Sequence, residues 1–285
     1  MIGPGTWVVD LDGVVWLTGE GIPGSAAAVE RLRQAGRRVV FATNNSALTA
    51  AELAARLDRV GIPTAPDDMV SSAQAAARLV PVGATALALA DPGVVEALAD
   101  RGVTVVDDGP ADVVVVGWTR RFDFDRLTAA TRAVYGGARL IGTNDDPTHP
   151  TPDGLIPGGG ALLAAVATAT GTTPEVAGKP YQPMADLITE RTGPVAVVVG
   201  DRPATDGLLA RRLGAPFGLV LSGVTASPDG PELNGPGLGG PELGGMVADV
   251  VADDLAHLVD EILSADPVRP GDGVLPQTVA NKRLQ

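Results

Sequence analysis

The stretch Thr6-Trp7-Val8-Val9-Asp10-Leu11-Asp12-Gly13-Val14-Val15 decides how the chain folds. Apolar residues followed by a polar turn are typical of a strand that is buried on both faces and ends at Asp10. Ligands of open α/β sheets bind beyond the carboxyl ends of the strands, so this position predicts that Asp10 and Asp12 lie in a functional site. The same residues also suit an ordinary turn, because Asp bonds nearby backbone and Gly13 adopts positive φ without steric cost. The rest of the chain must decide between these interpretations.

The composition is that of a globular protein with a core of small aliphatic residues. Of 285 residues, 45% are hydrophobic and only 3% aromatic, which favours helices packed closely on a sheet. The net charge of −13 argues against nucleic-acid binding, because there is no basic stripe to displace counterions from phosphates. The absence of cysteine excludes disulfides and thiolate metal sites. With no basic leader and no apolar run of about 18 residues, we expect a cytoplasmic protein that does not bind membranes.

Strand and helix signals alternate along the chain. Capping boxes at Thr49-Ala50-Ala51-Glu52 and Ser71-Ser72-Ala73-Gln74 predict the starts of two helices. Apolar runs predict buried strands, first at 38–42, 195–199 and 217–221, and then, as a separate group of short strands, at 86–90, 103–106, 113–117 and 140–143. The second group, with its own helices, forms a small α/β unit within a larger one.

We therefore predict an α/β fold with a doubly wound, Rossmann-like parallel sheet and an inserted smaller α/β domain. The core domain is expected at 1–77 and 177–265, and the inserted domain at 78–176. Residues 144–160 and the segment 225–245, which is rich in Gly and Pro, are expected to be loops. Residues 266–285 are expected to form a loosely held tail.

Polar residues mark four positions at the ends of predicted core segments. In chain order they are Asp10 with Asp12, Thr43, Lys179, and Asp201 with Asp206. Because the carboxyl ends of parallel strands meet at one edge of a sheet, all four positions project into the same crevice if the segments share a sheet. Each residue alone suits a simpler role, such as a strand-end hydroxyl, a surface lysine or a helix cap. Together the ordered set is much more specific than any one member.

This ordered set resembles the four motifs of the haloacid dehalogenase superfamily of phosphohydrolases, over residues 7 to about 224. The insert lies between the second motif and the lysine, which resembles the type II cap subclass. That subclass (type IIA) includes NagD-like, para-nitrophenylphosphatase-like, phosphoglycolate phosphatase-like and glycerol-3-phosphate phosphatase-like enzymes. Three local runs match it, namely Phe41-Ala42-Thr43-Asn44-Asn45-Ser46, Pro157-Gly158-Gly159-Gly160 and Gly178-Lys179-Pro180. The resemblance implies a Mg²⁺-dependent phosphatase whose inserted domain is a cap over the site.

The resemblance also implies a role for each motif residue. Asp10 would attack phosphorus to form an aspartyl-phosphate, and Asp12 would protonate the leaving oxygen and then activate water. Mg²⁺ would be bound by Asp10, the Asp12 carbonyl and Asp201. Asp206 would orient a metal-bound water or hold Lys179. The phosphate would be held by Thr43, Asn44, Asn45 and Lys179.

The substrate's leaving group would meet the cap. The candidate residues for contact with the leaving group are Asn144, Asp145, Asp146 and His149, which follow a predicted strand. The resemblance suggests glycerol 3-phosphate, phosphoglycolate, a sugar phosphate or a nucleoside monophosphate as substrate, and we favour glycerol 3-phosphate or a similar small ester. It also suggests a homodimer formed through the cap.

Two other functions stay open from the sequence. A phosphotransferase or mutase on the same core would pass the phosphoryl group to a hydroxyl instead of water. A receiver-type signalling or binding module also combines carboxylates, Thr and Lys on a doubly wound sheet, but its acid pair and its phosphorylated Asp lie on different strands of one uninterrupted domain. The Asp10-x-Asp12 pair and the long insert disfavour the module.

Overall fold

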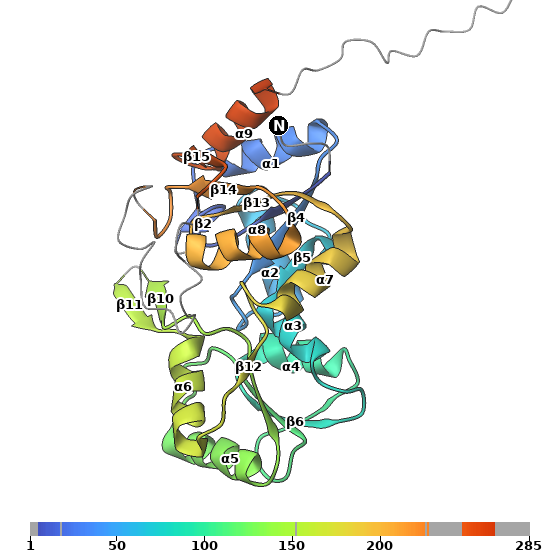
Figure 1. Ribbon diagram of the computed structural model, residues 1–285, viewed down its shortest axis with the longest axis vertical. Helices are drawn as coiled ribbons and strands as arrows, with labels where there is room; N and C mark the ends of the chain where they lie inside the picture. The colour runs from blue at the N-terminus through green and yellow to red at the C-terminus, as the bar shows by residue number, and fades with distance from the viewer. Residues whose placement is uncertain (1–4, 18, 152, 226, 228–246, 266–285) are drawn as a thin grey trace, which may run out of the picture.

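The computed structural model describes residues 5–17, 19–151, 153–225, 227 and 247–265, and contains two separate parallel sheets (Figure 1). The core sheet has the strand order β15-β14-β13-β1-β4-β5, and the cap sheet has the order β12-β9-β8-β6-β7. Neighbouring strands pair in parallel in both sheets. The predicted doubly wound α/β core with a smaller α/β unit is confirmed. Most of the segment 225–245 and all of 266–285 lie outside the described residues.

The core sheet is built outward from its central strand. Its strands are β1 (Thr6–Val9), β4 (Arg38–Thr43), β5 (Met69–Ser71), β13 (Val195–Gly200), β14 (Phe217–Val220) and β15 (Val250–Ala252). The chain runs from β1 through β4 to β5, then returns to β13 on the other side of β1 and continues to β14 and β15. The strand order therefore reverses between β1 and β13, and this switch point is where open α/β sheets bind ligands. Val9 of β1 is paired there with Val199 of β13.

Helices cover both faces of the core sheet. The helices α1 (Ser25–Gln34), α2 (Ala50–Arg59) and α9 (Leu255–Ala265) contribute to one apolar layer. On the other face the layer is formed by α3 (Ser72–Arg78), α7 (Gln182–Thr192) and α8 (Leu208–Leu213). Both predicted capping boxes are confirmed, since Thr49 caps α2 and Ser71 caps α3 in reciprocal bonds with the residue three positions on.

The cap sheet carries its own helices. Its strands are β6 (Thr85–Leu89), β7 (Thr104–Val106), β8 (Val113–Val116), β9 (Arg139–Gly142) and β12 (Glu175–Val176), and its helices are α4 (Pro92–Ala99), α5 (Phe124–Tyr135) and α6 (Gly159–Thr170). One face of the sheet packs on α5 and α6. The other face joins α4 and, through it, α3 of the core in one continuous apolar cluster. The boundaries at 77/78 and 176/177 stay a prediction.

The expectation that residues 144–160 form a loop is wrong. An antiparallel hairpin, β10 (Thr148–Thr151) with β11 (Gly154–Pro157), occupies this segment, and α6 begins at Gly159. These strands contain Thr, Pro and Gly and bury little, so the alternation of apolar and polar residues that marks a strand is missing. A second small hairpin, β2 (Trp16–Leu17) with β3 (Glu20–Gly21), follows the first acidic motif. None of the described helices is both long and apolar enough to cross a membrane.

Candidate active site

A pocket of 570 Å³ lies between the core sheet and the cap. Its core wall includes Asp10, Asp12, Thr43, Lys179, Asp201 and Arg202, all at or beyond the carboxyl ends of β1, β4 and β13 or next to α7. Its cap wall includes Trp118, Asn144, Asp146, Thr148 and His149. Of the residues that the sequence placed at segment ends, all but Asp206 therefore line one pocket, together with part of the cap. Asp206 is buried beside Lys179.

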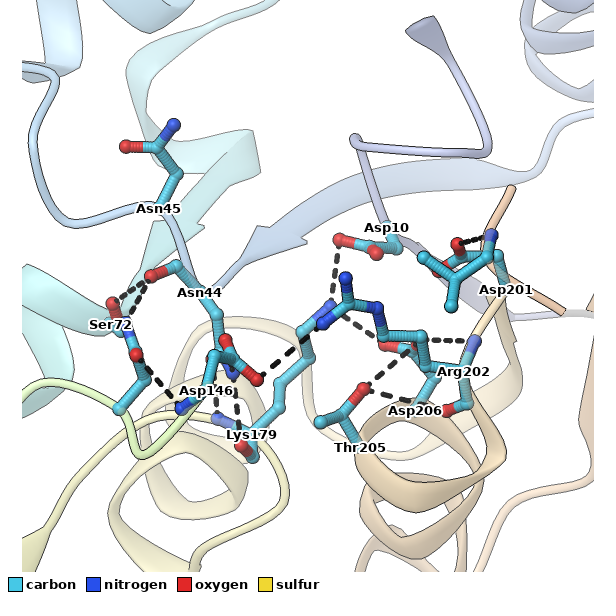
Figure 2. A network of polar contacts seen from close by, with 12 residues as sticks. Asp10, Asn44, Asn45, Ser72, Asp146, Lys179, Asp201, Arg202, Thr205 and Asp206 are labelled. Atoms are coloured by element: carbon cyan, nitrogen blue, oxygen red, sulfur yellow. Dashed lines mark hydrogen bonds and ion pairs between the residues drawn. The ribbon is translucent and has the colours of Figure 1, made fainter. Parts of the chain in front are cut away.

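Lys179 occupies the centre of the core wall. Its side chain is 3% exposed, and its Nζ lies 2.7 Å from Asp10 Oδ1 and 2.7 Å from Asp206 Oδ1 (Figure 2). Burial acts to lower the pKa of Lys179, but the two carboxylates outweigh burial and hold the pKa above its ordinary value. The ammonium is therefore protonated at neutral pH and fixed between two acids.

The carboxylates outnumber the ammonium. Oxygens of Asp10, Asp201 and Asp206 lie within 4.8 Å of one another. Burial, together with repulsion from the neighbouring acids, raises the pKa of Asp10 well above its ordinary range and raises the pKa of Asp201 to about 6. Ionisation of these acids is therefore costly in the structure as it stands, and a divalent cation between them would favour their charged forms.

The three carboxylates differ in how many of their oxygens already have partners. Asp206 Oδ1 accepts from Lys179 Nζ, and its Oδ2 accepts from the Arg202 backbone N–H at 3.1 Å. Asp201 Oδ2 accepts from the Val224 N–H at 2.6 Å, whereas Asp201 Oδ1 is buried and has no partner among the described residues. A buried carboxylate oxygen without a partner, beside Asp10, fits the hard oxygen ligands that Mg²⁺ prefers.

Backbone without side chains closes around Asp201. A Cβ at Gly13, whose φ is +84°, would lie 2.4 Å from Asp201 Oδ2, and a Cβ at Gly223 would lie 2.0 Å from the same oxygen. Only glycine permits these two loops to approach so closely. Gly13 therefore serves the acidic site and not merely a local turn.

Asp12 lies beside this cluster with its carboxylate turned to another partner. Its Oδ1 accepts a hydrogen bond from the indole Nε1 of Trp16 at 2.9 Å. Asp12 lines the pocket and is only partly buried. The indole holds the carboxylate in one orientation at the pocket wall, as a proton donor facing a substrate would require.

The last residue of β4, Thr43, and the two asparagines after it have different surroundings. Thr43 is buried at the pocket, and its Oγ1 accepts from the Asn45 N–H at 3.0 Å. The side chain of Asn45 points away from the polar network, and its Oδ1 accepts from the Ala47 N–H at 3.0 Å. The carboxamide of Asn44 binds the Lys179 backbone, accepting from its N–H at 2.7 Å and donating to its C=O at 3.1 Å. Asn44 thus positions Lys179.

The cap loop that contains Asn144 and Asp146 is hydrogen-bonded to Asn44. Asn144 donates to the Asn44 carbonyl at 2.8 Å, and Asp146 Oδ2 accepts from Asn44 Nδ2 at 3.1 Å. His149 lines the pocket, with its ring 5.5 Å from the Trp118 ring. Asp145 lies outside this pocket, because its carboxylate accepts from the Tyr181 hydroxyl at 2.5 Å and lines a different cavity of 1070 Å³.

Sequence comparison with known families accounts for this arrangement of motifs. Residues 7–104 match the model of the haloacid dehalogenase-like hydrolases, and residues 176–258 match a second model, of HAD-hydrolase-like proteins. The chain belongs to the haloacid dehalogenase-like hydrolases. The two matched segments contain the four motif acids, Asp10, Asp12, Asp201 and Asp206, and Lys179. The resemblance drawn from the sequence motifs is confirmed.

Named relatives of this hydrolase are phosphatases. It is 38% identical over 234 residues to D-glycerol 3-phosphate phosphatase of Mycobacterium tuberculosis, an alignment that covers 78% of this chain but 64% of the relative. It is 34% identical to dihydroxyacetone phosphatase of Corynebacterium glutamicum, with 77% of this chain and 82% of the relative covered. The chain thus spans less than two thirds of the mycobacterial relative and most of the corynebacterial one.

Solved structures share the fold of the hydrolase. The glycerol phosphate phosphatase of Mycobacterium tuberculosis in complex with magnesium superposes with a TM-score of 0.79 at 31% identity, covering 90% of this chain and 76% of that one. The p-nitrophenyl phosphatase of Archaeoglobus fulgidus gives a TM-score of 0.82 at 30% identity, covering 90% and 99%. The two-sheet architecture is therefore that of phosphatases in this family, one of which has been solved with the expected metal.

Arg202 and Trp118 are among the pocket residues that sequence analysis did not predict. Arg202 lines the pocket and pairs with Asp146 of the cap, Nη1 to Oδ1, at 3.7 Å. Trp118 follows β8 and donates from Nε1 to the Pro157 carbonyl of β11 at 3.0 Å, which fixes the hairpin. Signals existed for both, since Arg202 directly follows a motif acid and Trp118 is one of three tryptophans in the chain.

Proposed function

We propose that this hydrolase is a Mg²⁺-dependent phosphatase that acts on small phosphate monoesters through an aspartyl-phosphate on Asp10. The observation that carries the proposal is the placement of the Asp10 carboxylate beside both the buried ammonium of Lys179 and the carboxylate of Asp201, whose Oδ1 has no partner among the described residues. A nucleophilic carboxylate needs positive charge on both sides before an anionic phosphate can approach it.

The side chains divide the chemistry into two displacements. In the first, an oxygen of Asp10 bonds to phosphorus while the bond to the leaving oxygen breaks, and Asp12 gives that oxygen its proton. In the second, Asp12 takes a proton from water, whose oxygen bonds to phosphorus as the bond to Asp10 breaks. Inorganic phosphate leaves, and both carboxyl groups return to their starting protonation states.

The residues around Asp10 support this sequence of steps. Lys179 offsets charge on the phosphate oxygens, and Asn44 holds the Lys179 backbone in place. Asp10 and Asp201, with the Asp12 carbonyl, would hold Mg²⁺. When bound, the ion supplies charge neutralisation for the approach of two anions.

The size and walls of the pocket favour a small substrate. A volume of 570 Å³ accommodates a metabolite, and the cap covers the site. The cap wall around Trp118, Thr148 and His149 offers hydroxyl, indole and imidazole groups, which suit a hydroxylated leaving group. With relatives named for D-glycerol 3-phosphate and dihydroxyacetone, we favour glycerol 3-phosphate or a similar small ester over phosphoglycolate, sugar phosphates and nucleoside monophosphates. A cytoplasmic location and a homodimer formed through the cap remain predictions.

Phosphate release from a panel of these esters tests the proposal. Wild-type protein and Asp10→Asn are assayed side by side, each with Mg²⁺ and with EDTA. We expect release by the wild type with Mg²⁺ only, and none from Asp10→Asn. Because Asn cannot form the acyl-phosphate but keeps the shape of Asp, a folded and inactive Asp10→Asn shows that the reaction requires the Asp10 carboxylate. Phosphate trapped on Asp10 of the wild type assigns it as the nucleophile.

The remaining alternatives give different products in the same assay. A phosphotransferase or mutase would produce a bisphosphorylated sugar and little inorganic phosphate. A phospho-accepting module would hold a long-lived phosphate on Asp10 without turnover. Absence of phosphate release from every ester by folded wild-type protein would reject the phosphatase assignment.

A further inference from the structure

Arg202 is a cation of the pocket that the motif roles leave unexplained. It follows Asp201 directly, lines the pocket, and is held at its backbone N–H by Asp206 Oδ2 at 3.1 Å. Its guanidinium projects from the core toward Asp146 on the cap loop (Figure 2). The side chain therefore lines the same pocket as Asp10.

Lys179 and Arg202, two of the cations that line the pocket, are held very differently. Lys179 has a carboxylate oxygen 2.7 Å away on each of two sides, so its charge is already closely matched. Arg202 meets Asp146 at 3.7 Å, which is longer than a hydrogen bond. A guanidinium has five N–H donors in a planar fork, and this fork fits two phosphate oxygens at once. Arg202 is thus the cation better able to accept a new anionic partner.

Asp146, in contrast, is firmly placed. Its Oδ2 accepts from Asn44 Nδ2 at 3.1 Å, and its backbone N–H donates to Asn144 Oδ1 at 3.2 Å. Asn144 in turn donates to the Asn44 carbonyl at 2.8 Å. The carboxylate is anchored to the core through Asn44, while the guanidinium opposite is only loosely bound.

We propose that Arg202 binds the phosphate group of the substrate, and that Asp146 is a positioning residue that competes with phosphate for the guanidinium. The inference rests on the proposed phosphatase function. A phosphate dianion offers Arg202 two short charge-assisted hydrogen bonds in place of one loose ion pair. Asp146 thus aims the guanidinium into the pocket and yields it when phosphate binds, so the cap loop influences affinity for the phosphate group.

The two partners should therefore change phosphate affinity in opposite directions. The measurements are KM for the best ester, kcat, and the inhibition constant of inorganic phosphate. Arg202→Gln should raise KM and the inhibition constant about 10- to 100-fold, more than it lowers kcat, because charge-assisted bonds are lost. Arg202→Lys should recover part of the affinity. Asp146→Asn should lower the inhibition constant by about three- to tenfold, because the competing charge is removed and the side-chain shape is kept.

A double variant distinguishes competition for Arg202 from the direct repulsion between the Asp146 charge and the phosphate. If Asp146 acts through Arg202, the gain from Asp146→Asn disappears in an Arg202→Gln background. A gain that persists there would reject the positioning role. Asp145→Asn is the matched control, since it removes the same charge one residue away but from a side chain that faces Tyr181, and it should leave phosphate inhibition as in the wild type.

The outcomes distinguish this inference from the proposed function. If the wild type releases phosphate and Arg202→Gln leaves KM and phosphate inhibition unchanged, Arg202 is not a phosphate ligand and the inference fails alone. If Arg202→Gln and Asp146→Asn both weaken phosphate binding, the Arg202–Asp146 ion pair only holds the core and cap in place, and the inference also fails. Calorimetric titration of the same variants with inorganic phosphate and Mg²⁺ tests Arg202 even if no ester is hydrolysed.

Discussion

The Nζ of Lys179 lies 2.7 Å from Oδ1 of Asp206, and both side chains are almost fully buried. The same ammonium reaches Asp10 at equal distance, so one buried cation balances two acids, one directly after β1 and one in the helical segment Pro203–Gly207 that follows β13. A pair of this kind costs desolvation to form, but removing one partner leaves an uncompensated charge in the interior. Lys179 therefore matters to the stability of the core, in addition to the phosphate-binding role that we propose for it.

Lys179→Met should lower the unfolding free energy of the metal-free protein by about 3–5 kcal/mol. Two buried carboxylates then face each other without a cation. Mg²⁺ should restore part of the loss, because it offsets the same charge. Urea unfolding with EDTA and with Mg²⁺ measures both effects.

A surface ion pair provides the control for Lys179→Met. Arg78 pairs with Glu190 at 2.5 Å, but the two side chains are 31% and 60% exposed. Arg78→Met should therefore cost less than about 1 kcal/mol. Equal losses in the two variants would contradict a special role for the buried pair.

Trp16→Phe should reduce kcat by about tenfold with little change in KM. The indole donates to Asp12 Oδ1 at 2.9 Å, and phenylalanine removes this donor while keeping most of the apolar volume. The acid then loses its fixed orientation. Steady-state kinetics on the best ester measures the effect.

Trp7→Phe is the matched control for Trp16→Phe. Trp7 is 1% exposed, but its Nε1 has no hydrogen-bond partner among the described residues. The substitution therefore removes an indole without removing a bond to Asp12, and kcat should stay at the wild-type value. A similar fall in kcat for both variants would assign the effect to packing.

Gly13→Ala should weaken Mg²⁺ binding by about 10- to 100-fold, because the new Cβ would lie 2.4 Å from Asp201 Oδ2 and displace the carboxylate. The residue also has a φ of +84°, which costs an L-residue about 1–2 kcal/mol. Titration of metal-dependent thermal stabilisation gives the affinity. Gly36→Ala has a similar strain at φ +71° and nothing within 4 Å of the new Cβ, so it should lower stability and leave Mg²⁺ affinity unchanged.

The acids of the site could be predicted because their positions at the sheet edge depend on the local sequence alone. An apolar strand that ends in a polar turn places its last side chains at the sheet edge, which fixed Asp10 after β1 and Asp201 after β13. The strands β5 and β15 were not predicted, because Met69–Ser71 has only two apolar residues before a capping box and Val250–Ala252 directly precedes two aspartates. They complete the sheet by pairing with strands already in place.

The missed parts of the site depend on contacts between distant segments. Asn44 was assigned to phosphate binding, but which way its carboxamide turns depends on where the Lys179 backbone passes, far along the chain. Arg202 has no recognisable role until Asp146 is seen opposite it. In the β10–β11 hairpin, the sequence Pro152-Asp153-Gly154 is a turn signal, but the flanking strands lack an alternating apolar face and gave no strand prediction.

The last prediction concerns pH and the contact between Tyr181 and Asp145. Burial raises the pKa of Tyr181, and the hydrogen bond to Asp145 at 2.5 Å raises it further, because the phenolate would face a carboxylate. The folded protein therefore keeps this proton at a pH where the unfolded chain, with a tyrosine pKa of about 10, has lost it. The contribution to stability is present below that pH and is lost as the pH rises toward the folded-state pKa.

Absorbance of the phenolate in Tyr135→Phe isolates Tyr181, since the chain has only two tyrosines. The folded variant should ionise at higher pH than the same chain in denaturant. Asp145→Asn should bring the folded midpoint down, because the neutral amide no longer repels the phenolate, while the part of the shift caused by burial remains. An unchanged midpoint in Asp145→Asn would mean that burial alone raises the pKa and that the carboxylate does not hold the Tyr181 proton.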